Sequence, residues 1–156
     1  VQNIRNKKIS MEDTLFISEE TNQVMSRSII HSNDVLISIA GTIGRSAVVP
    51  HNSLPMNCNQ ALAIVRLNET INPHFFCHWL ESDEARTQIS GKKVTATISN
   101  LSLTQIKGLK IPIPSLGEQE SIVKILDKIV DGKRNVESLI EGYDYAYKGL
   151  IKKLIG

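Results

Sequence analysis

The sequence predicts an α+β fold, in which a small mixed β-sheet domain with short helices over residues 1–115 precedes one long helix over residues 116–156. Two patterns support this prediction. The nearly continuous apolar and β-branched run Val35–Ala40 is typical of a strand that is buried on both faces. Beyond Leu116, apolar residues recur with a four-three spacing, which is typical of a helix that packs against another helix.

The first strand signals are short. Val1–Arg5 has a strand pattern, and because no Met precedes it we expect the chain to be a fragment of a longer one. Leu15–Ser18 reads as a second short strand. The polar residues Glu19–Asn22 follow it, and they predict a turn or the start of a helix.

A hairpin is the clearest element of the domain. Val35–Ala40 and Ser46–Pro50 are separated only by a short loop that contains Gly41 and Gly44. Because glycine adopts positive φ without a steric cost, these two residues suit the tip of a hairpin. Ala61–Leu67 is a third core strand.

A helix is predicted to start after Asn72 and to run from Pro73 toward Ile89. Proline suits the first turn of a helix, where its missing N–H costs nothing. After Gly91 comes a polar segment, residues 92–100, with two lysines and several hydroxyl side chains. We expect this segment to be a loop.

The long helix presents an apolar seam that Lys133 interrupts. A 40-residue helix would be roughly 60 Å long, at about 1.5 Å per residue, so a globular domain of this size cannot cover it. The seam therefore predicts a partner helix, most simply in an antiparallel homodimer with two-fold symmetry. Its residues are Ile122, Leu126, Ile129, Val136, Ile140, Tyr143, Tyr147, Leu150 and Leu154. Further apolar residues, Ile125, Leu139 and Ile151, widen the stripe enough for a second partner.

Composition restricts the class of protein. The net charge is +2, and the small basic surplus lies in residues 51–115, which hold six basic and four acidic side chains. No apolar run is long enough to cross a bilayer and no secretory signal is present, so we expect a soluble, cytoplasmic protein with no membrane partner. Cys58 and Cys77 have neither a CxxC nor a disulfide-framework spacing, which indicates reduced thiols.

Several catalytic or binding motifs are incomplete. The loop Gly41–Gly44 lacks the GxGxxG of dinucleotide folds and the Gly-Lys-Ser/Thr of phosphate loops, and a strand, not a helix, follows it. His74, Cys77 and His78 have a spacing compatible with zinc, but no HExxH or paired CxxC supplies the remaining ligands. An ordinary helix with surface histidines is the simpler interpretation. No nucleophile has a base beside it in the sequence, and we expect no catalytic residue and no bound metal.

Four motifs in order resemble the target recognition domain of the specificity subunit of type I restriction–modification systems. They are Asn33–Gly44, Asn57–Gln60, Thr97–Leu101 and Ile111–Gln119, the last leading into the long helix. A complete subunit of that family has two such units with antiparallel helices. The resemblance implies that residues 1–115 are one recognition domain lacking its first part, and that residues 116–156 are the spacer and dimerisation helix.

The resemblance also implies the partners. Such a subunit is not an enzyme: it binds double-stranded DNA in a bacterial or archaeal cytoplasm and positions two other kinds of subunit. Modification subunits methylate adenine with S-adenosylmethionine, and restriction subunits use ATP to translocate and cut. Neither cofactor is expected on this chain.

Candidate DNA-binding residues are basic, hydroxyl and amide side chains, most of them outside the predicted strands, because such groups contact phosphates and base edges. They are Arg5, Lys7, Lys8, Arg27, Thr42, Arg45, Lys92, Lys93, Thr95, Thr97 and Asn100. Some of these charges have a simpler interpretation as solvated surface. Asn57–Gln60 is expected to cap a turn before the Ala61 strand and not to contact DNA.

Two alternatives remain open from the sequence. The chain could be a protein-interaction adaptor that acts only through its coiled coil and ignores DNA. It could also be the recognition tail of a single-chain restriction–methyltransferase, since such tails resemble the same domains. If the dimer is correct, the target should consist of two identical inverted half-sites across a fixed gap.

Overall fold

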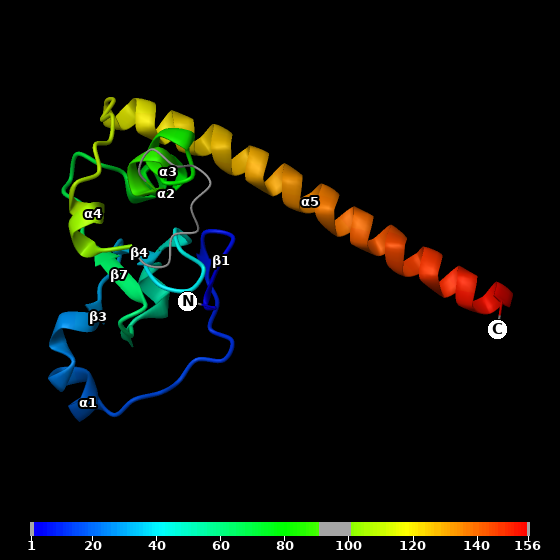
Figure 1. Cartoon of the computed structure of the whole chain (residues 1–156), viewed down its shortest axis with the longest axis horizontal. Coiled ribbons are helices and arrows are strands. Elements are labelled where there is room, and N and C mark those ends of the chain that lie inside the picture. The colour runs from blue at the N-terminus through cyan, green and yellow to red at the C-terminus, as the bar shows by residue number, and fades with distance from the viewer. Residues whose placement is uncertain (1, 91–100, 156) are drawn as a thin grey trace. The chain divides into compact units, whose positions relative to one another are not determined.

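The computed structural model describes residues 2–90 and 101–155, and the chain forms two compact units, Val1–Glu120 and Ser121–Gly156 (Figure 1). The predicted α+β class is confirmed. The described strands belong to three small antiparallel sheets instead of one mixed sheet. The strands are β1 (Ile4–Arg5), β2 (Lys8–Ile9), β3 (Ile29–Ile30), β4 (Val35–Ser38), β5 (Ser46–Val48), β6 (Met56–Asn57) and β7 (Leu62–Val65).

The central sheet has the order β5-β4-β7 and contains the predicted hairpin. Leu36 of β4 lies opposite Ala47 of β5 on one side and opposite Ile64 of β7 on the other. The other pairs are β1 with β2 and β3 with β6. All three predicted core strands are therefore present, although each paired segment is shorter than its sequence pattern.

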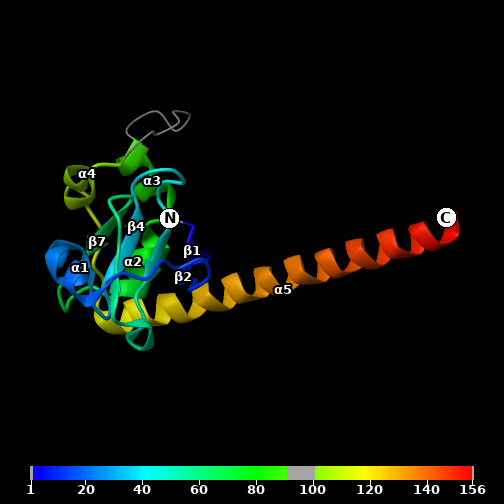
Figure 2. The same cartoon turned by 90° about the horizontal axis from the view of Figure 1, so that it is seen from below.

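β4 is buried on both faces, as its apolar run predicted. Val35 and Ile37 pack on one face against Phe76 and Trp79 of α2 (Pro73–Trp79). The alternate residue, Leu36, joins a second apolar cluster on the other face, which includes Ile4, Ile30, Ala47 and Val49. Figure 2 shows α2 beside β4 and β7. Because successive side chains of a strand point to opposite faces, one strand supports both clusters.

The prediction of one continuous helix from Pro73 toward Ile89 is wrong. It is divided into α2 (Pro73–Trp79) and α3 (Asp83–Ser90). The N–H groups of Glu81 and Ser82 donate to the carbonyls three residues earlier, 3.1 and 2.9 Å away, which tightens the last turn of α2. The Ser82 hydroxyl then accepts from the Ala85 N–H at 3.2 Å and caps the new helix.

The remaining helices also begin at caps. Ser18 caps α1 (Glu19–Val24), and Ser102 and Gln105 form a capping box at α4 (Leu103–Lys107). Two short 3₁₀ helices are η1 (Ser26–Ser28) and η2 (His51–Ser53). The long helix α5 runs from Leu116 to Ile155, with no break at its four glycines.

One predicted strand is absent. Leu15–Ser18 is extended but pairs with no strand among the described residues, and Leu15 and Phe16 remain 90% and 93% exposed. A strand needs a ladder partner, and the nearest strands, β1 and β2, pair with each other. The predicted helix start in Glu19–Asn22 is confirmed.

Candidate DNA interface and partner helix

The hairpin between β4 and β5 has a tip that is fixed by a buried serine. Ser38 is 0% exposed, and its hydroxyl donates to the Thr42 carbonyl at 2.5 Å and accepts from the Arg45 N–H at 2.9 Å. Gly41 and Gly44 have φ of 73° and 84°, a region that favours glycine. The tip is therefore a preorganised loop from which the exposed side chains of Thr42 and Arg45 extend.

Segments that are distant in the sequence meet at this hairpin. The Leu101 N–H donates to the Ile39 carbonyl at 3.0 Å, so Leu101 lies beside the hairpin of β4 and β5. An Arg45 guanidinium nitrogen lies 3.5 Å from the Ile4 carbonyl of β1. The candidates Lys92, Lys93, Thr95, Thr97 and Asn100 lie outside the described residues.

The hairpin of β1 and β2 supplies three candidate cations, Arg5, Lys7 and Lys8, and they differ in how exposed and how well paired they are. Lys7 Nζ lies 2.6 Å from Glu81 Oε2, and the lysine side chain is only 17% exposed. Arg5 lies 3.8 Å from Glu12 in a largely exposed pair, which contributes little in water. Lys8 is exposed. Lys8 and Arg5 can therefore reach a phosphate more easily than Lys7 can.

Arg27 lies in η1 beside β3, apart from the hairpin tip (Figures 1 and 2). It is exposed. The structure thus brings Arg5, Lys7, Lys8, Thr42 and Arg45 into one region and leaves Arg27 outside it. All six remain predictions as DNA contacts.

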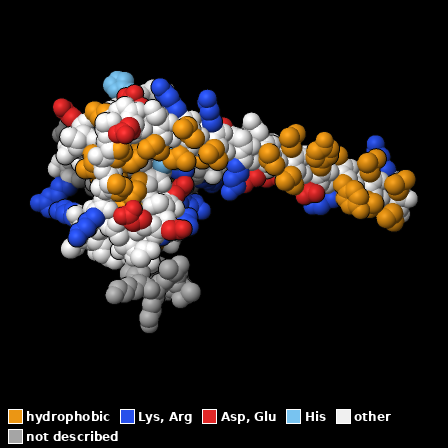
Figure 3. All heavy atoms as spheres, turned by 90° about the horizontal axis from the view of Figure 1, so that it is seen from above, with side chains coloured by type: hydrophobic (Ala, Val, Ile, Leu, Met, Phe, Trp, Pro, Cys, Tyr) orange, Lys and Arg blue, Asp and Glu red, His pale blue; other side chains and the backbone are white. Residues whose placement is uncertain are grey.

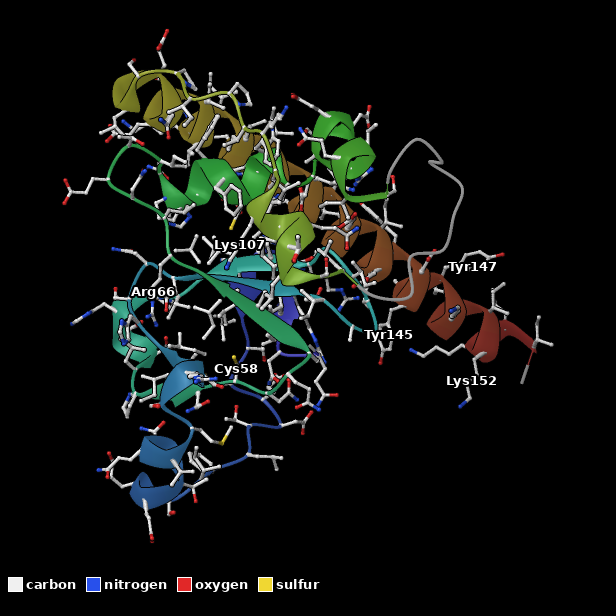
Figure 4. All side chains as sticks on the ribbon, turned by 60° about the vertical axis from the view of Figure 1, so that its left-hand side comes forward. Cys58, Arg66, Lys107, Tyr145, Tyr147 and Lys152 are labelled. Atoms are coloured by element: carbon white, nitrogen blue, oxygen red, sulfur yellow. The ribbon has the colours of Figure 1, made fainter. Side chains whose placement is uncertain are left out.

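Arg66 is a cation that the sequence did not single out. Its Nε lies 3.0 Å from Oδ1 of Asp34, and another guanidinium nitrogen donates to the Ile29 carbonyl at 2.8 Å. The Asp34 side chain is 3% exposed and also accepts from the His31 N–H at 2.7 Å. Arg66 therefore compensates a buried carboxylate and ties β3 to the end of β7. Figure 4 shows Arg66 and a further exposed cation, Lys107 of α4.

The structural role predicted for Asn57–Gln60 is confirmed. The Asn57 amide donates to Asn22 at 3.0 Å and to the Met25 carbonyl at 3.3 Å, while its oxygen accepts from the Cys58 N–H at 2.8 Å. The Asn59 oxygen accepts from the Ala61 N–H at 3.1 Å. Both side chains satisfy backbone or neighbouring polar groups before β7.

The cysteines have no sign of activation. Burial raises the pKa of the Cys77 thiol to about 11, and burial also raises the pKa of Cys58. A raised pKa lowers the thiolate fraction, and the thiolate is the reactive form. Within residues 2–90 and 101–155, no three His, Cys, Asp or Glu side chains form a group that could hold a metal ion.

The seam of α5 has no cover within its own unit. The seam residue Ile129 is 61% exposed, Ile140 is 55%, Tyr147 is 66% and Leu154 is 80%. Figure 3 shows hydrophobic side chains along most of the helix. Tyr145 is 83% exposed and points away from Tyr147 (Figure 4). An exposed apolar stripe of this length is typical of a helix that packs against another helix.

No described helix is both long enough and apolar enough to cross a membrane. The long helix α5 has the length, but charged residues occur along it.

Comparisons with known proteins agree with this geometry. A family model described as type I restriction modification DNA specificity domain matches residues 4–141. The EcoBI specificity subunit of Escherichia coli is 27% identical over 143 residues, which cover 90% of this chain and 30% of that subunit. The StySPI specificity subunit of Salmonella potsdam is 30% identical over 134 residues, which cover 82% and 28%. The chain thus spans less than a third of these relatives.

A solved structure gives the same relationship. The HsdS subunit from Thermoanaerobacter tengcongensis superposes with a TM-score of 0.59 and 27% sequence identity, over 73% of this chain and 30% of that one.

Proposed function

Because this chain belongs to the type I restriction–modification DNA specificity family, we propose that it recognises a specific double-stranded DNA sequence within a type I restriction–modification complex. The structural observation that best supports this function is the hairpin tip held by Ser38. A loop that is ordered before binding loses less conformational entropy when it binds.

The tip suits a division of labour between base reading and phosphate binding. The Arg45 guanidinium has the fork of donors that matches O6 and N7 of guanine in the major groove, and the Thr42 hydroxyl can donate or accept. Lys8 and Arg5, on the neighbouring β1–β2 turn, are suited to phosphate contacts, which fix the register of a protein on the duplex. We assign Lys7 a smaller role because Glu81 already compensates its charge.

The role proposed for the chain is non-catalytic. Modification subunits that use S-adenosylmethionine and restriction subunits that use ATP would perform the chemistry, with this chain selecting the site. The state of the cysteines supports this division, since the Cys77 thiol, with a pKa of about 11, is a poor nucleophile near neutral pH.

We further propose that α5 forms an antiparallel homodimer with a second copy. The exposed seam supplies the apolar contact. Charge favours the antiparallel orientation: residues 116–127 hold three acidic side chains and one basic, whereas residues 144–155 hold three basic and one acidic. Opposite orientations place the acidic end of one helix beside the basic end of the other, and parallel helices would place like charges together.

A selection from random double-stranded DNA at one stated moderate salt concentration tests the function, because affinity for DNA depends steeply on salt. Two inverted half-sites across a constant gap would support both recognition and the antiparallel dimer. One half-site would support recognition and refute the dimer. If neither the chain alone nor the chain with its modification subunit enriched any sequence, recognition would be refuted in favour of an adaptor.

A matched pair of variants sharpens the test. Arg45→Ala should change which sequences are enriched, because it removes a proposed base contact from the fixed tip. Lys128→Ala, an exposed position of α5 outside the seam and outside its two charged ends, removes the same charge from the chain and should leave the selected sequence unchanged.

A further inference from the structure

Gln119 is a buried polar side chain on a mostly exposed helix. It is 0% exposed, whereas Leu116, Gly117, Glu118 and Glu120 around it are all exposed. Glutamine is normally a surface residue, and burying its amide is costly unless every hydrogen-bonding group is satisfied. This position therefore needs an explanation beyond helix formation.

The amide of Gln119 is satisfied by backbone groups from two other segments. Its Oε1 accepts from the Asn72 N–H at 2.8 Å, and its Nε2 donates to the carbonyls of Thr70 at 2.9 Å and Pro114 at 2.8 Å. All of these residues belong to the unit Val1–Glu120. A primary amide has two donor hydrogens and an acceptor oxygen, and here each of these groups has a partner.

The partner Asn72 is itself the N-cap of α2. Its side-chain oxygen accepts from the N–H groups of His74 and Phe75 at 2.9 and 3.2 Å, while its own N–H is taken by Gln119. The start of α5 is thereby joined to the start of α2, whose residues Phe76 and Trp79 pack in the main core. One side chain connects the first turn of the long helix to the most buried part of the domain.

A separate feature, a capping box, determines where α5 begins. The Glu118 carboxylate accepts from the Ser115 N–H at 2.9 Å, and the Ser115 hydroxyl accepts from the Glu118 N–H at 3.4 Å. The hydrogen bonds from Ser115 lower the pKa of Glu118. This capping box is local and exposed, so it can start a helix in any orientation. Gln119 alone among these side chains ties that first turn to α2.

We propose that Gln119 is a positioning residue that fixes the starting direction and rotational phase of α5 on the recognition unit, and thereby sets the gap between two half-sites. This inference rests on the proposed function. From Gln119 to Ile155 the helix extends about 55 Å at about 1.5 Å per residue. A change of roughly 10° at its first turn would displace its end by about 10 Å, or about three base pairs at roughly 3.4 Å each.

The test compares Gln119→Met with the control Glu120→Ala. Methionine keeps the length and volume of glutamine but makes none of the three hydrogen bonds. Glu120 is the exposed neighbour and belongs to the same turn. Affinity for one half-site, and for paired half-sites whose gap changes by single base pairs, is measured for each protein at one salt concentration.

For wild type and Glu120→Ala, we expect a preference of at least tenfold for one gap over gaps that differ by two base pairs. Gln119→Met should bind a single half-site within about twofold of wild type, while its gap preference falls below threefold. An equal loss of affinity at every gap and at the single half-site would indicate a merely structural role and would overturn the proposal.

A second measurement does not depend on DNA. Spin labels at Lys107→Cys and Lys128→Cys, both exposed positions, report a distance distribution in a Cys58→Ser background, with labelled copies diluted by unlabelled ones. Gln119→Met should broaden it and Glu120→Ala should not. An unchanged distribution would overturn the positioning role, whatever the DNA result. A broadened distribution in a protein that selects no DNA would uphold positioning and refute the proposed function.

If Gln119→Met does not fold, Gln119→Glu replaces it in both measurements. Glutamate retains the oxygen that accepts from Asn72 and loses the two donors to Thr70 and Pro114. The same broadening is expected from it, and an unchanged gap preference together with an unchanged distance distribution would again overturn the proposal.

Discussion

Replacing Ile129 and Ile140 with Asp should convert the proposed dimer into monomers. The two side chains are 61% and 55% exposed in a single chain, so this is the surface that a second helix would cover. Full burial of an isoleucine is worth about 1.5–3 kcal/mol, so covering the exposed part is worth about 1–2 kcal/mol per side chain.

Two-fold symmetry doubles the effect of each substitution. Losing the contact in both copies costs about 2–4 kcal/mol per position, which corresponds to roughly a 30- to 700-fold weaker dimer. The carboxylate adds a desolvation cost if the dimer forms at all. If wild type dimerises with a dissociation constant in the micromolar range, the double variant should therefore be a monomer at the concentrations at which wild type is a dimer.

Sedimentation velocity over a concentration series measures this dissociation constant. Tyr145→Asp is the matched control, because Tyr145 is 83% exposed and lies about 150° around the helix from both isoleucines. It introduces the same charge into the same helix and should leave the dimer intact. Survival of the dimer in the double variant, or equal weakening by the control, would refute the seam as the dimer contact.

Four further predictions concern the domain. Arg45→Ala should weaken binding to the selected DNA by about 1–3 kcal/mol, measured by fluorescence anisotropy at a fixed salt concentration. Lys7→Ala should weaken DNA binding less than about threefold, because Lys7 is paired with Glu81. A larger loss of affinity for Lys7→Ala than for Arg45→Ala would contradict the proposed roles of the two residues. Ser38→Ala should lower the free energy of unfolding, measured in urea, by about 1–2 kcal/mol, since two partly buried backbone groups of the tip lose a hydrogen-bond partner. In the folded chain at pH 8 a disulfide reagent should modify Cys58 well before Cys77, whose pKa of about 11 keeps it protonated, and both should react at once in urea. The same shift predicts that the contribution of Cys77 to stability is constant below pH 9, the ordinary value for the thiol, and falls as the pH rises toward 11, because the unfolded thiol ionises first.

The sequence by itself determined the secondary-structure elements that depend on interactions between residues close together in the chain. Val35–Ala40 reads as a doubly buried strand, and β4 is buried on both faces. Asn72 and Pro73 mark the start of α2, and the four-three spacing marks α5. These signals are legible because side-chain period and capping chemistry act within a few residues. The same locality explains why the turn role of Asn57 and Asn59 follows from their place in the sequence.

Only the tertiary structure decided which side chains from distant segments meet. The positions of Lys7 and Glu81 in the sequence do not indicate that they form an ion pair. The sequence likewise does not indicate that Asp34 pairs with Arg66. The sequence pattern also missed the break between α2 and α3, because the apolar residues continue to Ile89 while the tight last turn of α2 and the Ser82 cap divide the helix.

Gln119 shows this limit most clearly. The sequence placed it in a motif at the start of a helix, where a polar residue would ordinarily face water. Its burial depends on backbone groups that lie 47 and 49 residues earlier in the chain. Periodicity and capping rules describe neighbours along the chain, whereas a hydrogen bond between distant segments forms only when the fold brings its donor and acceptor together.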